Sequence, residues 1–265
     1  VASQFKPISI YKLNEENTVD KLTNTGLDGF AGNWNDLVLE DVDNDGDNDI
    51  IALNLGINNR LHNMSNGELY LFTNDFDSNG DVDNVYCYKN GDKFYPIHLR
   101  EEMIMQMPAV KKKVLKYADY ADASLTDIFG DAIVKRSLIC NINEFNSGIF
   151  YNDNGSFTFV PLPKEVQYSE QKAVWCGDIN NDGWNDLIIG GNQYKAQPHI
   201  GMNAASFGHV LLNDKTGKFV HLSMDQSGLF EKGQIRDIES INVNGVTYLL
   251  IAKNNAPMSF YKINN

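Results

Sequence analysis

Three stretches of the chain place oxygen-bearing side chains at every second position. They cover residues 41–49, 75–83 and 178–186, and each fits the pattern D-x-[DN]-x-[DN]-G-x-x-D followed by apolar residues. Alternate carboxylates and amides can direct their oxygens at one centre, and the glycine lets the backbone turn sharply around it. Because Ca²⁺ prefers many hard oxygen ligands in a flexible shell, the sequence predicts a structural calcium site in each of these Asp loops.

The candidate calcium ligands occupy the odd positions of each loop. They are Asp41, Asp43, Asp45, Asp47 and Asp49, then Asp75, Asp77, Asn79, Asp81 and Asp83, then Asp178, Asn180, Asp182, Trp184 and Asp186. An EF-hand is excluded because its loop needs a bidentate Glu at the twelfth position, where this chain has Ala52, Tyr86 and Ile189. The alternative is a set of Asp/Asn/Gly turns without metal. It applies most to the second loop, where Ser78 and Asn79 stand in place of further acid.

The loops lie within a longer repeat that predicts the fold. Short β-branched and aromatic runs flank them, so each loop is expected to join two antiparallel strands. A second phrase, strand then Asn-Asp turn then strand, begins at residues 67, 148 and 208. The two hairpins together make a four-stranded unit, which is typical of a β-propeller blade. We assign units to residues 33–97 and 170–224, with partial units at 138–163 and 233–263.

The predicted fold class is therefore all-β. We expect one β-propeller domain over residues 1–265 with about four or five visible blades, forming either a small closed ring or part of a larger one. The run Ile8–Leu13 is expected to be the outer strand of a blade or to close the ring against the C-terminus. A helical insertion is predicted near residues 100–130, with a break at Pro108 and Ser124 as an N-cap. We expect this insertion to pack on the side or mouth of the propeller.

The composition of the chain argues against some classes of function and location. The chain has 265 residues and a net charge of −13, which argues against nucleic acid because phosphate binding needs a basic face. Cys87, Cys140 and Cys176 fit no disulfide framework, and each is predicted to be a small buried apolar residue. No apolar stretch reaches the length of a membrane span. Since calcium loops of this kind suit extracellular modules, we expect a secreted, periplasmic or cell-surface protein.

The Asp loops and several other segments resemble those of a known family. The Asp loops look like the FG-GAP/VCBS repeats of integrin α-chain propellers and secreted bacterial proteins. Further segments are similar to VCBS-repeat proteins of Bacteroidetes related to the UnbV/cartilage acidic protein group, among them residues 94–102, 107–113, 117–121 and 201–208. The resemblance implies a propeller, Ca²⁺ in the hairpin loops, a surface or secreted setting and no established catalysis. The chain departs from the subgroup at Gly201–Ala204, where a charged pair is replaced by Met202 and Asn203.

No catalytic constellation is visible, because the histidines are scattered and the paired acids already fall in the Asp loops. A binding face for sugar or peptide is predicted from polar inter-strand residues, with ordinary turn chemistry as the alternative. Its members are Asn192, Tyr194, His199, Asn203, Arg236, Asn254 and Asn255. The sequence thus favours a non-enzymatic adhesion or ligand-binding module for a glycan or a protein. The alternatives are a polysaccharide lyase or hydrolase working in the propeller mouth, and an assembly domain for another surface protein.

Overall fold

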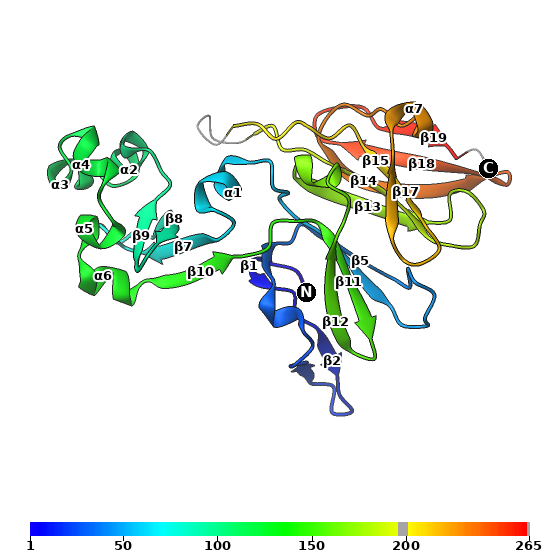
Figure 1. Ribbon diagram of the computed structural model, residues 1–265, viewed down its shortest axis with the longest axis horizontal. Coiled ribbons are helices and arrows are strands. Elements are labelled where there is room, and N and C mark those ends of the chain that lie inside the picture. Colours follow the sequence, from blue (N-terminus) through cyan, green and yellow to red (C-terminus); the bar gives the residue numbers. More distant parts are fainter. Residues whose placement is uncertain (196–200, 264–265) are drawn as a thin grey trace. The chain divides into compact units, whose positions relative to one another are not determined.

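The computed structural model describes residues 1–195 and 201–263 and shows a mainly β protein (Figure 1). The chain divides into two compact units, which are described separately below. One unit combines Val1–Asn59 with Phe145–Asn265, and the other is Arg60–Glu144. Among the described strands, three sheets have four antiparallel strands, and closure into a ring is not observed. None of the described helices is both long enough and apolar enough to cross a bilayer.

The first sheet is assembled from two distant parts of the sequence. Its order is β12-β11-β6-β5, with β5 at Asp36–Glu40, β6 at Asp49–Leu53, β11 at Gly148–Asp153 and β12 at Ser156–Pro161. The predicted unit 33–97 is therefore wrong, because β6 pairs with β11 rather than with the strand that follows it. All of β6 is buried, so this apolar strand needs a neighbour on each edge, and the partial unit 138–163 supplies the second one.

The second sheet is continuous in sequence and confirms the unit 170–224. It has the order β13-β14-β15-β16, with β13 at Gln171–Gly177, β14 at Asp186–Gly191, β15 at His209–Asn213 and β16 at Phe219–Leu222. One apolar cluster joins it to the first sheet through Ile51, Ile149, Leu187 and Leu211. The two sheets of this unit thus share a core.

A third sheet of three strands packs on the second. Its strands are β17 at Ile235–Val243, β18 at Val246–Lys253 and β19 at Ser259–Lys262. The contact is close at Gly190, where an added Cβ would lie 2.5 Å from the Ile235 side chain. The helix α7, Met224–Ser227, and the 3₁₀ helix η2, Val166–Tyr168, lie in connections of the same unit.

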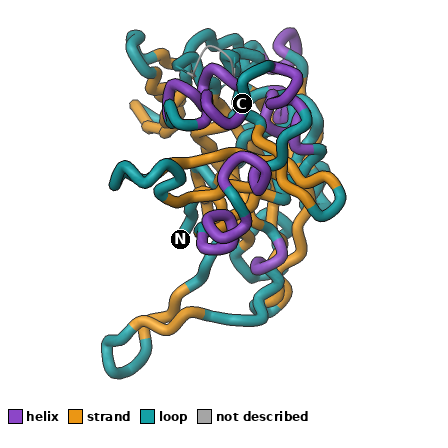
Figure 2. The backbone as a smooth tube through the Cα atoms, turned by 90° about the vertical axis from the view of Figure 1, so that its left-hand side faces the viewer, coloured by secondary structure: helices purple, strands orange, loops and turns teal. Residues whose placement is uncertain are grey.

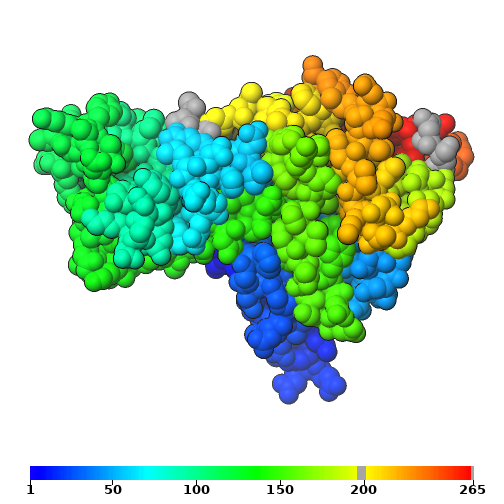
Figure 3. All heavy atoms as spheres, in the orientation of Figure 1, coloured from blue at the N-terminus to red at the C-terminus, as the bar shows by residue number. Residues whose placement is uncertain are grey.

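The N-terminal segment corrects another prediction. Strand β1, Gln4–Pro7, pairs with β4, Ala31–Asn33, and β2, Tyr11–Leu13, pairs with β3, Val19–Lys21. The 3₁₀ helix η1, Leu27–Gly29, follows the second pair. Residues 8–13 therefore neither form an outer blade strand nor meet the last sheet. The β2–β3 hairpin is fully exposed and projects away from its unit (Figures 2 and 3). Its apolar residues Tyr11, Leu13 and Val19 are exposed, and the hairpin forms a sheet of its own.

The Arg60–Glu144 unit combines a sheet with short helices. Its sheet has the order β10-β7-β8-β9, with β7 at Leu69–Asn74, β8 at Asp83–Asn90, β9 at Lys93–Pro96 and β10 at Leu138–Ile142. The helices are α1 at Arg60–Ser65, α2 at Arg100–Gln106, α3 at Val110–Lys113, α4 at Tyr117–Ala121, α5 at Leu125–Phe129 and α6 at Asp131–Arg136. Helical structure thus covers the region predicted near 100–130.

Apolar side chains hold these helices on their sheet. Met103 and Met107 are fully buried, and they join Phe72 and Val85 of the sheet in one cluster. Ser124 caps α5 as the sequence predicts, because its hydroxyl accepts a hydrogen bond from the amide of Asp127 at 3.2 Å. Each helix is too short to be stable alone, so packing on the sheet must maintain them.

All three cysteines are free, as the lack of a disulfide framework predicts. Cys87 is buried, and burial raises the pKa of its thiol. Cys140 and Cys176 are only half-buried, so burial is less complete than predicted for these two, although Cys176 packs against an apolar cluster. They lie in β10 and β13, respectively.

Candidate metal centres

Each Asp loop joins two antiparallel strands, as predicted. The hairpins are β5–β6, β7–β8 and β13–β14. The ninth loop residue begins the second strand in each case, namely Asp49, Asp83 and Asp186. The strand ladder therefore fixes the last carboxylate of each loop, while the turn positions the earlier ones.

The three loops share one backbone conformation. Positive φ angles occur at the fourth and sixth positions, at Asn44 (59°), Ser78 (63°), Asn181 (57°), Gly46 (99°), Gly80 (94°) and Gly183 (86°). Glycine adopts this region without strain and asparagine tolerates it. Ser78 is a less favoured residue for the same angle, so the second loop adopts the common shape in spite of its sequence.

Hydrogen bonds to the first and ninth carboxylates orient the ligands. Asp41 accepts the amides of Asp45 and Gly46 at 3.2 and 3.0 Å, and Asp49 accepts the amide of Val42 at 3.1 Å. The second and third loops repeat all three bonds at equivalent positions. Since backbone amides at equivalent positions bind these carboxylates in all three loops, the hydrogen bonds explain why aspartate recurs at the first and ninth positions.

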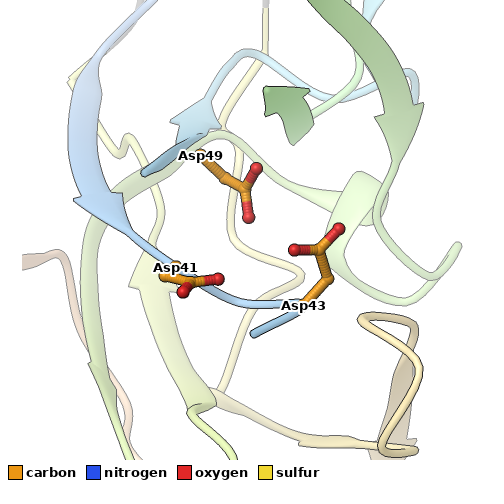
Figure 4. Close-up of side chains that lie close together, drawn as sticks. All are labelled: Asp41, Asp43 and Asp49. Atoms are coloured by element: carbon orange, nitrogen blue, oxygen red, sulfur yellow. The ribbon is translucent and has the colours of Figure 1, made fainter. Parts of the chain in front are cut away.

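Two of the loops bring three carboxylates together. Ligand oxygens of Asp41, Asp43 and Asp49 all lie within 4.8 Å of one another, and the side chains face a shared space (Figure 4). Asp75, Asp77 and Asp83 form the matching triad. The third loop has Asn180 in place of the middle carboxylate, and its Asp182 lies 3.4 Å from the ammonium group of Lys215. The two triads could hold metal ions such as calcium.

One oxygen in each triad lacks a partner. Oδ1 of Asp43 and Oδ1 of Asp77 are buried and accept no hydrogen bond within the described part of the chain. Burial, and then the charge of Asp45, raises the pKa of the Asp43 carboxyl. Burial also raises the pKa of Asp49, against the lowering effect of the Asn152 and Val42 amides. Buried and unpartnered carboxylate oxygens are unfavourable, and a divalent cation would satisfy them.

Sequence reasoning missed the residues that support the loops from outside. The amide of Asn152 donates to Asp49 at 2.8 Å, and its side chain donates to the carbonyl of Asn48 at 3.1 Å. Asn213 repeats both bonds, to Asp186 at 2.9 Å and to Asn185 at 3.2 Å. The signal was present in the sequence as the asparagine of the repeated Asn-Asp phrase.

The second loop is supported differently. There, the side-chain amide of Gln106 in α2 donates to Asp83 at 3.1 Å. A helix thus supplies the hydrogen bond that the Asn-Asp hairpin supplies to the other two loops. No local signal in the sequence pairs Gln106 with Asp83, since the two residues belong to different kinds of element.

Several residues of the predicted polar binding face form hydrogen bonds within the protein. The amide oxygen of Asn192, which is 1% exposed, accepts from Ser169 and Ser206, and its NH₂ donates to Ser206 and Gly233. Arg236 donates to the carbonyl of Asn192 at 3.0 Å. These bonds fit the alternative of loop-to-loop chemistry for Asn192 and Arg236.

The other members of the predicted face lie around Gln193 and Gln234. Asn203 pairs with Gln193 through backbone hydrogen bonds, and Gln234 binds the amide of Tyr194 and, through its carbonyl, that of Asn254. Tyr194 is 38% exposed. Asn255 has a φ of 56° in an exposed turn. His199 lies outside the described residues.

Comparison of the chain with models of known protein families gives no match, and comparison with curated proteins gives none either.

Proposed function

We propose that this chain is a calcium-stabilised, non-enzymatic β-sheet module of the FG-GAP/VCBS propeller type, belonging to a secreted or cell-surface protein. Its role would be adhesion or binding of a glycan or protein ligand. The observation that carries the proposal is the pair of matching carboxylate triads, each with a buried oxygen that no described residue satisfies. Calcium would satisfy that oxygen and offset the clustered negative charge.

The loop residues have distinct roles in this proposal. Asp41, Asp43 and Asp49 would hold the ion in the first loop, and Asp75, Asp77 and Asp83 would hold it in the second. The ion would supply positive charge where carboxylates otherwise repel one another. The backbone amides that already bind the first and ninth carboxylates keep these groups in place before the ion arrives, so little rearrangement is needed on binding.

The third loop would bind more weakly. Its middle position is an amide, and Lys215 already pairs with Asp182. We therefore expect two stronger sites and one weaker site. The net charge of −13 supports a partner other than nucleic acid. Millimolar extracellular calcium suits sites of modest affinity, which supports the proposed setting.

Thermal unfolding tests the proposal directly. A ligand that binds only the folded state stabilises it by RT ln(1 + [L]/Kd), about 2.7 kcal/mol at a hundredfold excess over Kd. For a chain of this size, such a gain raises Tm by roughly 5–10 °C. We expect calcium to raise Tm relative to EDTA, and magnesium to do so less because it requires a stricter geometry. Identical melting curves in EDTA and calcium would refute a stabilising metal.

A further inference from the structure

The Arg60–Glu144 unit contains a cavity that the proposed calcium sites do not use. Its volume is about 370 Å³, and four tyrosines line it, Tyr88, Tyr95, Tyr117 and Tyr120. Arg60, Arg100 and Glu101 also reach it. This volume falls in the range of small-molecule sites, which are lined mainly by apolar and aromatic side chains with a few polar groups. We call it the tyrosine cavity.

Several of its walls are held in place by the protein. The hydroxyl of Tyr120 donates to the carbonyl of His98 at 2.8 Å. Arg100 donates to the carbonyls of Val114 and Leu115, both at 2.9 Å. Its guanidinium group also lies 5.2 Å from the ring centre of Tyr117. Walls that are ordered before a ligand arrives reduce the entropy lost on binding.

Other groups in the cavity remain available. Tyr88 and Tyr95 are cross-strand partners in β8 and β9, and their rings stack with centres 5.5 Å apart. Neither of their hydroxyls has a hydrogen-bond partner within the described parts of the chain. Tyr117 is 66% exposed, although it is a large aromatic side chain. Tyrosine is favoured at binding surfaces because it offers a rigid apolar face and a polar hydroxyl together.

The charge around the cavity is opposite to that of the whole chain. Two arginines line it against a single acid, Glu101, which lies 3.3 Å from Arg100 and is paired with it. Arg60 is held by its own hydrogen bonds, to the sulfur of Met64 at 3.0 Å and the carbonyl of Ile97 at 3.3 Å. A cationic ligand would meet both guanidinium groups. An anionic ligand would meet complementary charge, which is local to this cavity because the chain carries −13 overall.

We propose that the tyrosine cavity binds a saccharide ring that carries a carboxylate, of the uronic acid class. The proposal rests on the ligand-binding part of the function proposed above and names its ligand class. The C–H bonds of a sugar ring carry partial positive charge and pack on the electron-rich faces of tyrosine. The free hydroxyls of Tyr88 and Tyr95 bond the ring hydroxyls. An arginine binds the carboxylate, a pairing that guanidinium geometry favours.

Calorimetric titration at one fixed calcium concentration tests this inference. The probe is a tetrasaccharide containing glucuronate, and its carboxyl-reduced counterpart is the matched ligand control. We expect the first to bind and the second to bind at least about tenfold more weakly. Absence of binding by the glucuronate probe, or equal binding of both, overturns the proposal.

Variants then locate the site. Tyr117→Ala and Tyr95→Ala should each weaken binding of the glucuronate probe about tenfold or more, as truncation of a tyrosine anchor typically does. Tyr168→Ala is the matched control, because Tyr168 is 42% exposed and lies in the other unit, and it should bind as the wild type does. Tyr117 is exposed, so its variant is expected to fold, which its melting curve verifies. Unchanged binding in a folded Tyr117→Ala variant places the ligand elsewhere and overturns the inference.

The same preparations separate this inference from the proposed calcium role. Tm in EDTA and in calcium reports on the Asp loops, whereas calorimetry reports on the cavity. Saccharide binding without any calcium-dependent stabilisation refutes the structural calcium role and supports the cavity. Calcium-dependent stabilisation without saccharide binding refutes the cavity alone.

Discussion

Replacing Asp43 by asparagine should stabilise the metal-free protein and weaken its stabilisation by calcium. Asp43 carries the unpartnered oxygen of the first triad, and its ligand oxygen lies within 4.8 Å of those of Asp41 and Asp49. Without metal, the substitution removes a negative charge from a crowded site. With metal, it replaces a charged ligand by a neutral one. The gain in stability expected without metal should therefore largely disappear in calcium, which few other mechanisms would produce.

The magnitude follows from the spacing of the carboxylates. Two unit charges about 4.8 Å apart repel by about 0.9 kcal/mol in bulk water and by about 3.5 kcal/mol at an effective dielectric constant of about 20. Asp43 is partly exposed, so the lower end applies to each neighbour, and the metal-free variant should gain about 1–2 kcal/mol. If the variant binds calcium about tenfold more weakly, its calcium-dependent stabilisation falls from about 2.7 to about 1.4 kcal/mol.

Thermal and urea unfolding of both proteins, in EDTA and in calcium, measure these quantities. In EDTA, Asp43→Asn should melt a few degrees above the wild type, and its rise in Tm with calcium should be smaller by roughly 3–5 °C. Glu239→Gln removes an exposed acid from β17 and serves as the control for a change in net charge alone. A variant that is less stable than the wild type in EDTA would show that Asp43 is not repelled, and the reasoning would then fail.

Two further predictions concern the supports of the sheets. Asn213→Ala should lower the free energy of unfolding by about 2–4 kcal/mol, because it leaves the buried carbonyl of Val42 and the partly buried carbonyl of Asn185 without their donor. Asn152→Ala should lower it by about 1 kcal/mol, as urea unfolding of both variants will show. Burial, and then His221, lowers the pKa of His209 to about 4. The unfolded chain therefore binds more protons between about pH 4 and pH 6.5, and stability should fall as pH decreases through that window, by up to about 3 kcal/mol. Burial also lowers the pKa of the neighbouring His221, and the charge of Glu165 partly opposes this by raising it. His209→Gln should flatten this part of the curve, and an unchanged slope would exclude His209 as its source.

The Asp loops could be predicted from sequence because their geometry is local. Side chains within the same nine residues satisfy backbone amides of the loop, as in the bonds from the amide of Asp47 to Asp45 at 2.9 Å and from the amide of Gly46 to Asp41 at 3.0 Å. The positions of positive φ coincide with glycine and, in two loops, with asparagine. A short segment therefore contains nearly all the information that specifies its own fold. The strands beside it follow from the same local pattern.

Strand partners across the chain could not be predicted in the same way. Strand β6 could pair equally well with either of two hairpins that share one repeated phrase, at Gly67–Asp75 and at Gly148–Asp153. The structure selects the more distant hairpin, whose Asn152 binds Asp49. The nearer hairpin contains its own Asp loop and builds a separate sheet with helices. Repeats in sequence thus reveal the unit but not which copies combine.

The asparagine at this repeated position also links one Asp loop to a neighbouring Asp loop in another sheet. Asn213 binds the third loop through its amide and the carbonyl of Val42 in the first loop through its side chain, at 2.8 Å. An added Cβ on Gly217, in the same turn, would lie 2.7 Å from the Cβ of Asp43. The turn between β15 and β16 is therefore packed against a neighbouring Asp loop, where only a residue without a side chain fits. An ion that orders the first loop would also order this contact between two sheets, so its effect on stability would extend beyond a single hairpin.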